Sequence, residues 1–382
     1  MEHIEKVGLR RGISHLLFRI NKTMFTSGPL VLMAIFCISG VLQPTIVQYL
    51  TLNGAFDKST LLIVLPNYLG MSFAVLTRYE VVHTTLQYVV WWDMAILSCV
   101  DILSQGLCLI GLVFAGSSIY IIVYSSTTIW AAVWSYFLLQ KQLNLQQWIG
   151  IVVVVMGLGV TALDSKASAG GASSKAVDAI VGIVLILLGS FTHALTWVLI
   201  EKWTTRQDET CHVADGPVSR APPRPAAAPE LVCSLMGVFG SIVYFAWQLL
   251  YTIPRWDTLV VTPIASKGGS MWHIGIAFCL LAFMGFLHAV SFYHLLGHVG
   301  SVATGVLKGV QSVAVLLLSH EAFCSVEVSQ CFTLYKGLSL VVVLSGVYFY
   351  SAYTGGAGGG AGKGGTGNPC EKGVEVGGSH AY

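Results

Sequence analysis

Apolar and polar positions follow a long-range pattern along this chain. Runs of about 20 apolar residues are separated by short stretches rich in charge, Gly or Pro, and such a run is what a helix needs to cross the ~30 Å hydrocarbon core of a bilayer. Backbone groups in that core must be hydrogen-bonded within their own segment, so the runs are predicted as helices. The pattern predicts an all-α membrane protein with ten transmembrane helices: Gly28–Leu52, Ser59–Thr77, Val89–Ala115, Ser117–Leu139, Gln147–Leu163, Val177–Ile200, Leu231–Ile253, His273–Leu296, Gly300–Ser319 and Phe332–Tyr350.

Composition agrees with a bilayer as the main solvent. Of 382 residues, 55% are hydrophobic and only 10% are charged, and the mean hydropathy is +0.74, far above that of a soluble domain. The 20 basic and 18 acidic residues leave a net charge of +2, which provides no electrostatic basis for binding nucleic acid. The lipid bilayer is therefore an expected partner, and nucleic acid is not.

The basic residues also predict the orientation. With the N-terminus in the cytosol, thirteen Lys and Arg fall on the cytosolic side and six on the other, and Lys308 lies within a span. This is the positive-inside bias, so both termini are predicted to be cytosolic. The predicted organisation is a cytosolic segment 1–27, a first five-helix unit 28–163, a lumenal loop 164–176, a second five-helix unit 177–351 that contains a Pro-rich cytosolic loop 204–229, and a Gly-rich cytosolic tail 352–382.

The two units show traces of an internal duplication. Gly111–Gly116 (GLVFAG) and Leu295–Gly300 (LLGHVG) stand 184 residues apart, and each leads into a serine and another span. Val- and Gly-rich segments then follow in both units, at Ile149–Gly159 and Lys336–Gly346. Because five is odd, the two units would cross the membrane in opposite directions. Two inverted five-helix repeats with a site near the midplane are typical of secondary transporters.

Three segments sharpen this into a family resemblance. Tyr120 and Tyr124, followed after the span by Gln147–Gly150 (QWIG), and then Trp197–Trp203 (WVLIEKW) and Thr304–Ser319 (TGVLKGVQSVAVLLLS), resemble patterns of the drug/metabolite transporter superfamily and, within it, of solute carrier family 35. The resemblance implies a Golgi or other endomembrane antiporter that exchanges a nucleotide sugar for a nucleoside monophosphate. The segment Cys99–Leu103 is instead similar to the F branch of that family, which leaves open a carrier of a cationic or nucleobase-like metabolite.

Five residues are candidates for substrate binding. Lys308 lies eight residues into its span, about 12 Å deep at ~1.5 Å per residue, where a charge is costly unless it faces water or a partner. Asp101 carries the same cost, so it would pair with Lys308, bind a cationic substrate or shuttle a proton. Gln105 follows on the same helix face, and Tyr120 and Tyr124, spaced i, i+4, would stack on a base or sugar ring or anchor the helix at the interface.

Other chemistry is weaker in the sequence. Glu201 and Lys202 would form a cytosolic gate or a solvated helix end. His294 and His298 lack the further ligands that zinc needs, and no set of nucleophile, base and orienting group is visible, so we expect no metal, no cofactor and no enzymatic activity. Cys324 and Cys331 are either bonded in a lumen or free. A homodimer and a non-transporting scaffold are also left open, although a scaffold has no use for buried charges.

Overall fold

The computed structural model describes residues 28–55, 57, 59–115, 120, 123–124, 126–141, 143–168, 173–204, 228–326, 331–334, 337–338, 341–342, 344–346 and 348–350. Its elements are all helical: α2 (Gly28–Leu52), α3 (Val64–Ser72), α4 (Tyr79–Leu86), α5 (Trp91–Ala115), α7 (Thr127–Leu139), α8 (Leu145–Ser168), α9 (Ser173–Thr204), α10 (Pro229–Trp247), α11 (Thr262–Ser266), α12 (Met271–His298) and α13 (Ser301–Phe323). The described part therefore confirms the all-α prediction.

Six helical stretches are long and apolar enough to cross a membrane: Gly28–Leu52, Trp91–Leu112, Ile180–Thr204, Pro229–Arg255, Met271–His298 and Ser301–Phe323. Three shorter apolar helices, Val64–Leu76, Thr127–Leu139 and Leu145–Gly157, occupy further predicted spans. The last predicted span, 332–350, lies only partly within the described residues. Many large apolar side chains face outward, among them Leu250, which is 80% exposed. Such a surface suits lipid rather than water, and the chain is an integral, multi-pass membrane protein.

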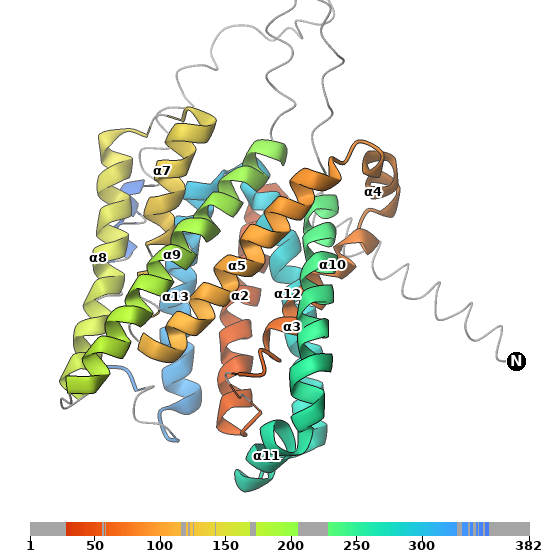
Figure 1. Cartoon of the computed structure of the whole chain (residues 1–382). Helices are drawn as coiled ribbons and strands as arrows, with labels where there is room; N and C mark the ends of the chain where they lie inside the picture. Colours follow the sequence, from red (N-terminus) through yellow and green to blue (C-terminus); the bar gives the residue numbers. More distant parts are fainter. Residues whose placement is uncertain are drawn as a thin grey trace, which may run out of the picture.

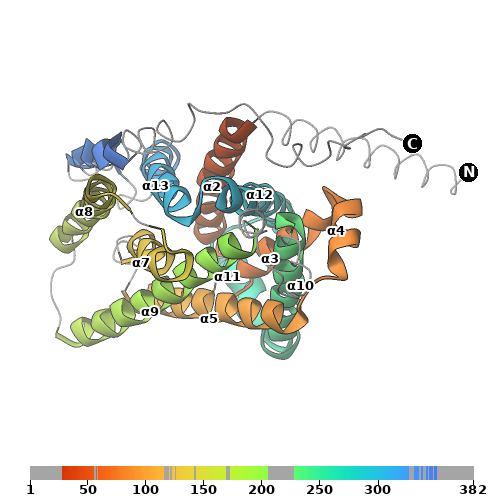
Figure 2. The same cartoon turned by 90° about the horizontal axis from the view of Figure 1, so that it is seen from above.

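The helices pack as a bundle in which neighbours in space are distant in sequence (Figures 1 and 2). Helix α5 runs along α9, α2 packs on α12 and α13, and α3 packs on both α10 and α12. Glycines allow the close approach of α3, since a Cβ at Gly70 would lie 2.3 Å from the carbonyl of Ala282 and one at Gly237 would lie 2.3 Å from the backbone nitrogen of Ser72. The main buried cluster, which includes Phe36, Leu97, Trp197, Val198 and Leu295, joins these helices.

Basic residues that the sequence assigns to the cytosolic side lie together at one end of the bundle. Figure 1 shows α4, the end of α9 and the start of α10 at the top, and α11 at the bottom. Arg78 precedes α4, Lys141 follows α7 and Lys202 closes α9; we call this end the basic end. Lys267, which follows α11, donates a hydrogen bond to the carbonyl of Thr51 at the opposite end. Residues that the sequence predicts on the same side of the membrane therefore lie at the same end of the bundle.

Several helix bounds differ from the sequence prediction. The second span begins only at Val64, because Leu61 has a positive φ of 53° that interrupts the helix, and it ends in a 3-10 turn, Phe73–Leu76. Helix α4 lies in a stretch predicted as a connection. Helices α8 and α9 extend into 164–176, predicted as a loop, so that only 169–172 lie outside the described residues there. The seventh span continues past α10 through π-helical and 3-10 turns, Gln248–Thr252, Ile253–Arg255 and Asp257–Val261.

Helix α2 contains a proline, Pro44, inside the span. Proline has no N–H to donate to the carbonyl four residues earlier, so the helix lacks one hydrogen bond at Gly40. Both Gly40 and Pro44 border the cavity described next.

Candidate functional site

A cavity with two adjoining lobes lies inside the bundle. The first, which we call the hydroxyl lobe, has a volume of about 360 Å³ and is lined by Thr127, Thr128 and Ser312 among others. The second, the carboxylate lobe, has a volume of about 280 Å³ and contains Asp101. Both lobes share five lining residues: Gln43, Tyr124, Trp197, His288 and Lys308. The lobes therefore meet around Lys308, and their size is in the range of ~300–1,000 Å³ typical of ligand sites.

Lys308 projects from the middle of α13 into a ring of aromatic side chains. Its Nζ lies 4.7 Å from the ring centroid of Trp197, 5.4 Å from that of Phe292 and 5.8 Å from that of Tyr124. Within the described part of the chain, no hydrogen bond or ion pair reaches this ammonium. Attraction to aromatic faces compensates a buried cation only in part, so three N–H donors remain available to a ligand.

Asp101, on α5, is held by neighbours other than Lys308. The Tyr68 hydroxyl donates a 2.6 Å hydrogen bond to its Oδ2, and Nδ1 of His193 lies 3.7 Å from its Oδ1. The same Nδ1 is 3.2 Å from the Ser104 hydroxyl. No ion pair within 4.0 Å joins Asp101 to Lys308 among the described residues, so the direct pairing considered from sequence is not formed. The two charges instead face one cavity from different helices.

The remaining sequence candidates border the same cavity. Tyr120 and Tyr124 stack on one another with ring centroids 5.3 Å apart; Tyr120 lines the hydroxyl lobe, and Tyr124 lines both lobes. Gln105 lines the carboxylate lobe. All five predicted substrate residues thus come together around one space.

Other lining residues have no marker in the sequence. Trp197, Phe292 and Gln43 are apolar or neutral side chains within apolar spans, and only the tertiary packing turns them inward. His288 stacks on Phe36 at 4.6 Å and lies 3.3 Å from the hydroxyl of Ser39. A histidine inside an otherwise apolar span is the one signal in the sequence that could have marked His288 as a lining residue.

Two buried carboxylates close the basic end of the bundle. Glu201 is 1% exposed; it pairs with Lys141 and accepts a 2.7 Å hydrogen bond from the backbone N–H of Ser301, at the start of α13. Its partner is therefore Lys141, and the adjacent Lys202 makes no hydrogen bond or ion pair in the described part. Because Glu201 is buried between helices, the prediction of a solvated helix end was wrong.

The second carboxylate, Glu230, lies at the start of α10 and is also 1% exposed. Its Oε1 is 3.4 Å from Nη1 of Arg78 and 3.3 Å from Nε2 of His294. These three residues are distant in the chain, and no sequence pattern connects them. Each of the two carboxylates thus links helices that precede residue 170 to helices that follow it.

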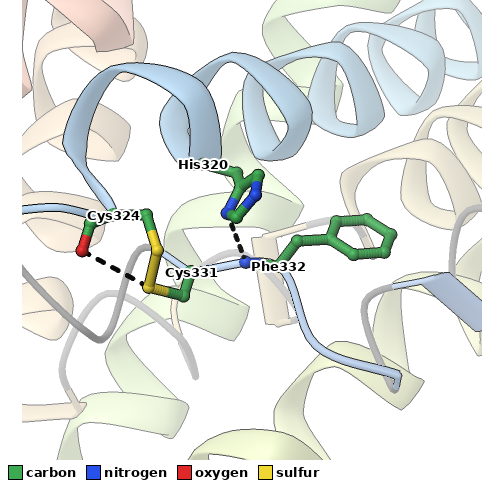
Figure 3. Close-up of a disulfide and its surroundings, with 4 residues drawn as sticks. All are labelled: His320, Cys324, Cys331 and Phe332. Carbon is green, nitrogen blue, oxygen red and sulfur yellow. Dashed lines mark hydrogen bonds between the residues drawn. A yellow bond between two sulfur atoms is a disulfide. The ribbon is translucent and has the colours of Figure 1, made fainter.

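The opposite end of α13 carries a disulfide between Cys324 and Cys331 (Figure 3). This decides between the two states that the sequence left open. His320 accepts a 2.9 Å hydrogen bond from the backbone N–H of Phe332 beside it. His320, Cys324 and Cys331 lie close enough to share a metal ion, but sulfurs joined in a disulfide have no thiolate to offer.

Comparison with known protein families finds a match in the first half of the chain. Residues 59–163 match the EamA-like transporter family. This segment runs from α3 into α8 and supplies Tyr68, Asp101 and Tyr124 to the cavity. This similarity of one segment to a transporter family favours a membrane transporter of small molecules.

Two further comparisons show similarity to known proteins. An uncharacterized protein of Schizosaccharomyces pombe is 29% identical over 119 residues, which are 31% of this chain and 35% of that protein. The match thus spans about a third of the relative. A solved crystal structure of a protein covers 84% of this chain and 98% of its own chain, with a TM-score of 0.60 and 12% identity. At that identity the likeness shows a shared fold.

Proposed function

We propose that this protein is a secondary transporter that binds an anionic small molecule in the central cavity and moves it by alternating access. The observation that carries the proposal is Lys308, an ammonium with no hydrogen-bond acceptor among the described residues, held over aromatic rings where the two lobes meet. Burying a cation in this position costs free energy unless a ligand or water forms hydrogen bonds with it. An anionic group binding there would form the charge-assisted hydrogen bonds that the protein itself does not supply.

The substrate class that we favour is a nucleotide sugar, exchanged for a nucleoside monophosphate in the Golgi or another endomembrane compartment. The resemblance to solute carrier family 35 supports this choice, and so does the division of the cavity. Phosphate oxygens at Lys308 would leave the sugar in the hydroxyl lobe, near Thr128 and Ser312, and the base in the carboxylate lobe, near Asp101 and Gln105.

The proposed transport cycle uses two inverted five-helix repeats. The internal duplication in the sequence supports this arrangement, with both termini in the cytosol. Glu201 with Lys141, and Glu230 with Arg78, would act as the cytosolic gate, because each pair links the two units at the basic end. Rocking of the units about Lys308 would break these pairs and open the cavity to the cytosol.

A second candidate is a carrier of a cationic or nucleobase-like metabolite. The observation in its favour is the carboxylate of Asp101, which borders the same cavity as Lys308. In that case Asp101 would be the principal contact, and Lys308 would be dispensable.

The test uses purified full-length protein in proteoliposomes, with Lys308→Ala compared with Lys267→Ala, an exposed lysine at the far end of the bundle. We expect Lys308→Ala to lower exchange of a nucleotide sugar for a nucleoside monophosphate by ~100-fold, since a charge-assisted contact contributes roughly 1.5–3 kcal/mol and others also position the phosphate. Lys267→Ala should exchange normally.

Wild-type exchange by a folded Lys308→Ala protein would exclude this role for Lys308. Loss of transport of an organic cation in Asp101→Asn alone would favour the second candidate.

A further inference from the structure

The three rings around Lys308, Trp197, Phe292 and Tyr124, form what we call the aromatic box. Trp197 is at its centre: its indole meets Phe292 edge to face at 5.3 Å and lies beneath the Lys308 ammonium, 4.7 Å from the ring centroid. Trp197 and Tyr124 border both lobes, and Phe292 borders the carboxylate lobe. Aromatic faces therefore line the point where a ligand would pass from one lobe to the other.

The box is filled by a side chain of the protein itself. Trp197 is only 2% exposed, so its face is not available while the ammonium rests over it. A lysine has a flexible four-carbon stem and a mobile ammonium. Hydrogen bonds to an anion are stronger than contact with an aromatic face, so an anion in the cavity would draw the ammonium away from Trp197. That movement would leave an open indole face between two other rings.

We propose that the aromatic box is a second subsite, which takes a planar aromatic ring attached to the anionic group of the substrate, and that Lys308 occupies this subsite in the empty carrier. The inference rests on the proposed function, because it needs an anion at Lys308. It places ring stacking on Trp197, on α9, rather than on the Tyr120 and Tyr124 pair that the sequence favours. Substrate selection then depends on the ring as well as on the charge.

One experiment compares two anions that share a ribose phosphate, uridine monophosphate and ribose 5-phosphate, which lacks the base. Binding to the purified full chain is measured for wild type, Trp197→Phe, Trp197→Leu and the control Trp272→Leu, an exposed tryptophan. We expect wild type, Trp197→Phe and the control to bind uridine monophosphate roughly tenfold tighter than ribose 5-phosphate. In Trp197→Leu this ratio should fall to about one.

These results separate the two proposals. The aromatic subsite would be overturned if the affinity ratio in Trp197→Leu stayed near the wild-type value, or if the variant bound both anions more weakly by the same factor. Either result would leave an anion site at Lys308. If neither anion binds the wild type, or if Lys308→Ala binds ribose 5-phosphate as tightly as the wild type does, the proposed function fails instead.

A second experiment tests the occupancy of the box by Lys308, and it also decides the case if Trp197→Leu does not fold. The probe is tetramethylammonium, a cation of the size that aromatic rings bind. We expect Lys308→Ala, with the box vacated, to bind this probe at least about tenfold tighter than the wild type, and Trp197→Phe in the same background to retain the gain. No gain in Lys308→Ala, checked as folded by its melting temperature, would show that Lys308 does not fill a ligand subsite.

Discussion

At the scale of single residues, the cavity combines one cation and one carboxylate that do not neutralise each other directly. Both could be found from sequence, because a charged residue stands out within an apolar span. Trp197 and Phe292 could not, since an aromatic residue in an apolar span has no contrast with its surroundings. Which face of a helix turns inward depends on packing between α9, α12 and α13, and that packing is formed by contacts across the whole chain.

A first prediction concerns the charge of Asp101. Asp101→Asn keeps the shape and can still accept the hydrogen bond from Tyr68, but it removes a negative charge from the cavity. Anionic ligands should then bind more tightly, by about 1.7 kcal/mol for a charge separation of roughly 10 Å at an effective dielectric of ~20. Calorimetric titration of a nucleoside monophosphate measures this change. Tyr68→Phe, which removes the hydrogen bond but not the charge, is the control, and weaker anion binding by Asp101→Asn would contradict the electrostatic argument.

At the scale of helices, the sequence located the spans better than their ends or their irregularities. The number of consecutive apolar residues indicates how long a segment can remain within lipid. Nine of the ten spans predicted in this way contain described helices. The count says nothing about a short helix such as α4, about the positive φ at Leu61 or about π-helical turns after α10. Those features follow from local backbone geometry and from neighbouring helices.

The ends of α7, α9 and α13 meet at Glu201, and this gives a second prediction. Lys141 has a half-exposed side chain, whereas that of Glu201 is 1% exposed. Lys141→Met should therefore be the more damaging change, by about 3 kcal/mol, because it removes a partner from a buried carboxylate. Glu201→Gln should cost less, since the amide oxygen can still accept from Ser301 and Lys141 can turn to water.

Thermal unfolding of both single variants and the double variant measures these effects as a cycle. The double variant should be more stable than the sum of the single losses predicts, because the two residues interact directly. Equal losses that add without coupling would mean that the pair does not hold the basic end closed.

At the scale of the whole molecule, the orientation in the membrane is a prediction from the distribution of Lys and Arg over the whole sequence. The basic end is predicted to face the cytosol. A cysteine at Gln146, an exposed position at the start of α8, should then react from the cytosolic side, and one at Ser266, an exposed position at the end of α11, from the other side. The test uses an impermeant maleimide on sealed vesicles, in a background where Cys99, Cys211, Cys279 and Cys370 are changed to serine. Labelling of both positions from one side would refute the orientation.

The proline in α2 changes the hydrogen bonding of the main chain beside the cavity. Because Pro44 cannot donate to the carbonyl of Gly40, this main-chain oxygen lacks its helical donor, and both residues border the hydroxyl lobe. Such an oxygen accepts hydrogen bonds from hydroxyl or amine groups, and substitution of any neighbouring side chain leaves it in place. Replacing Pro44 by alanine would supply the missing N–H, so the proline ring determines whether this main-chain oxygen is engaged within the helix.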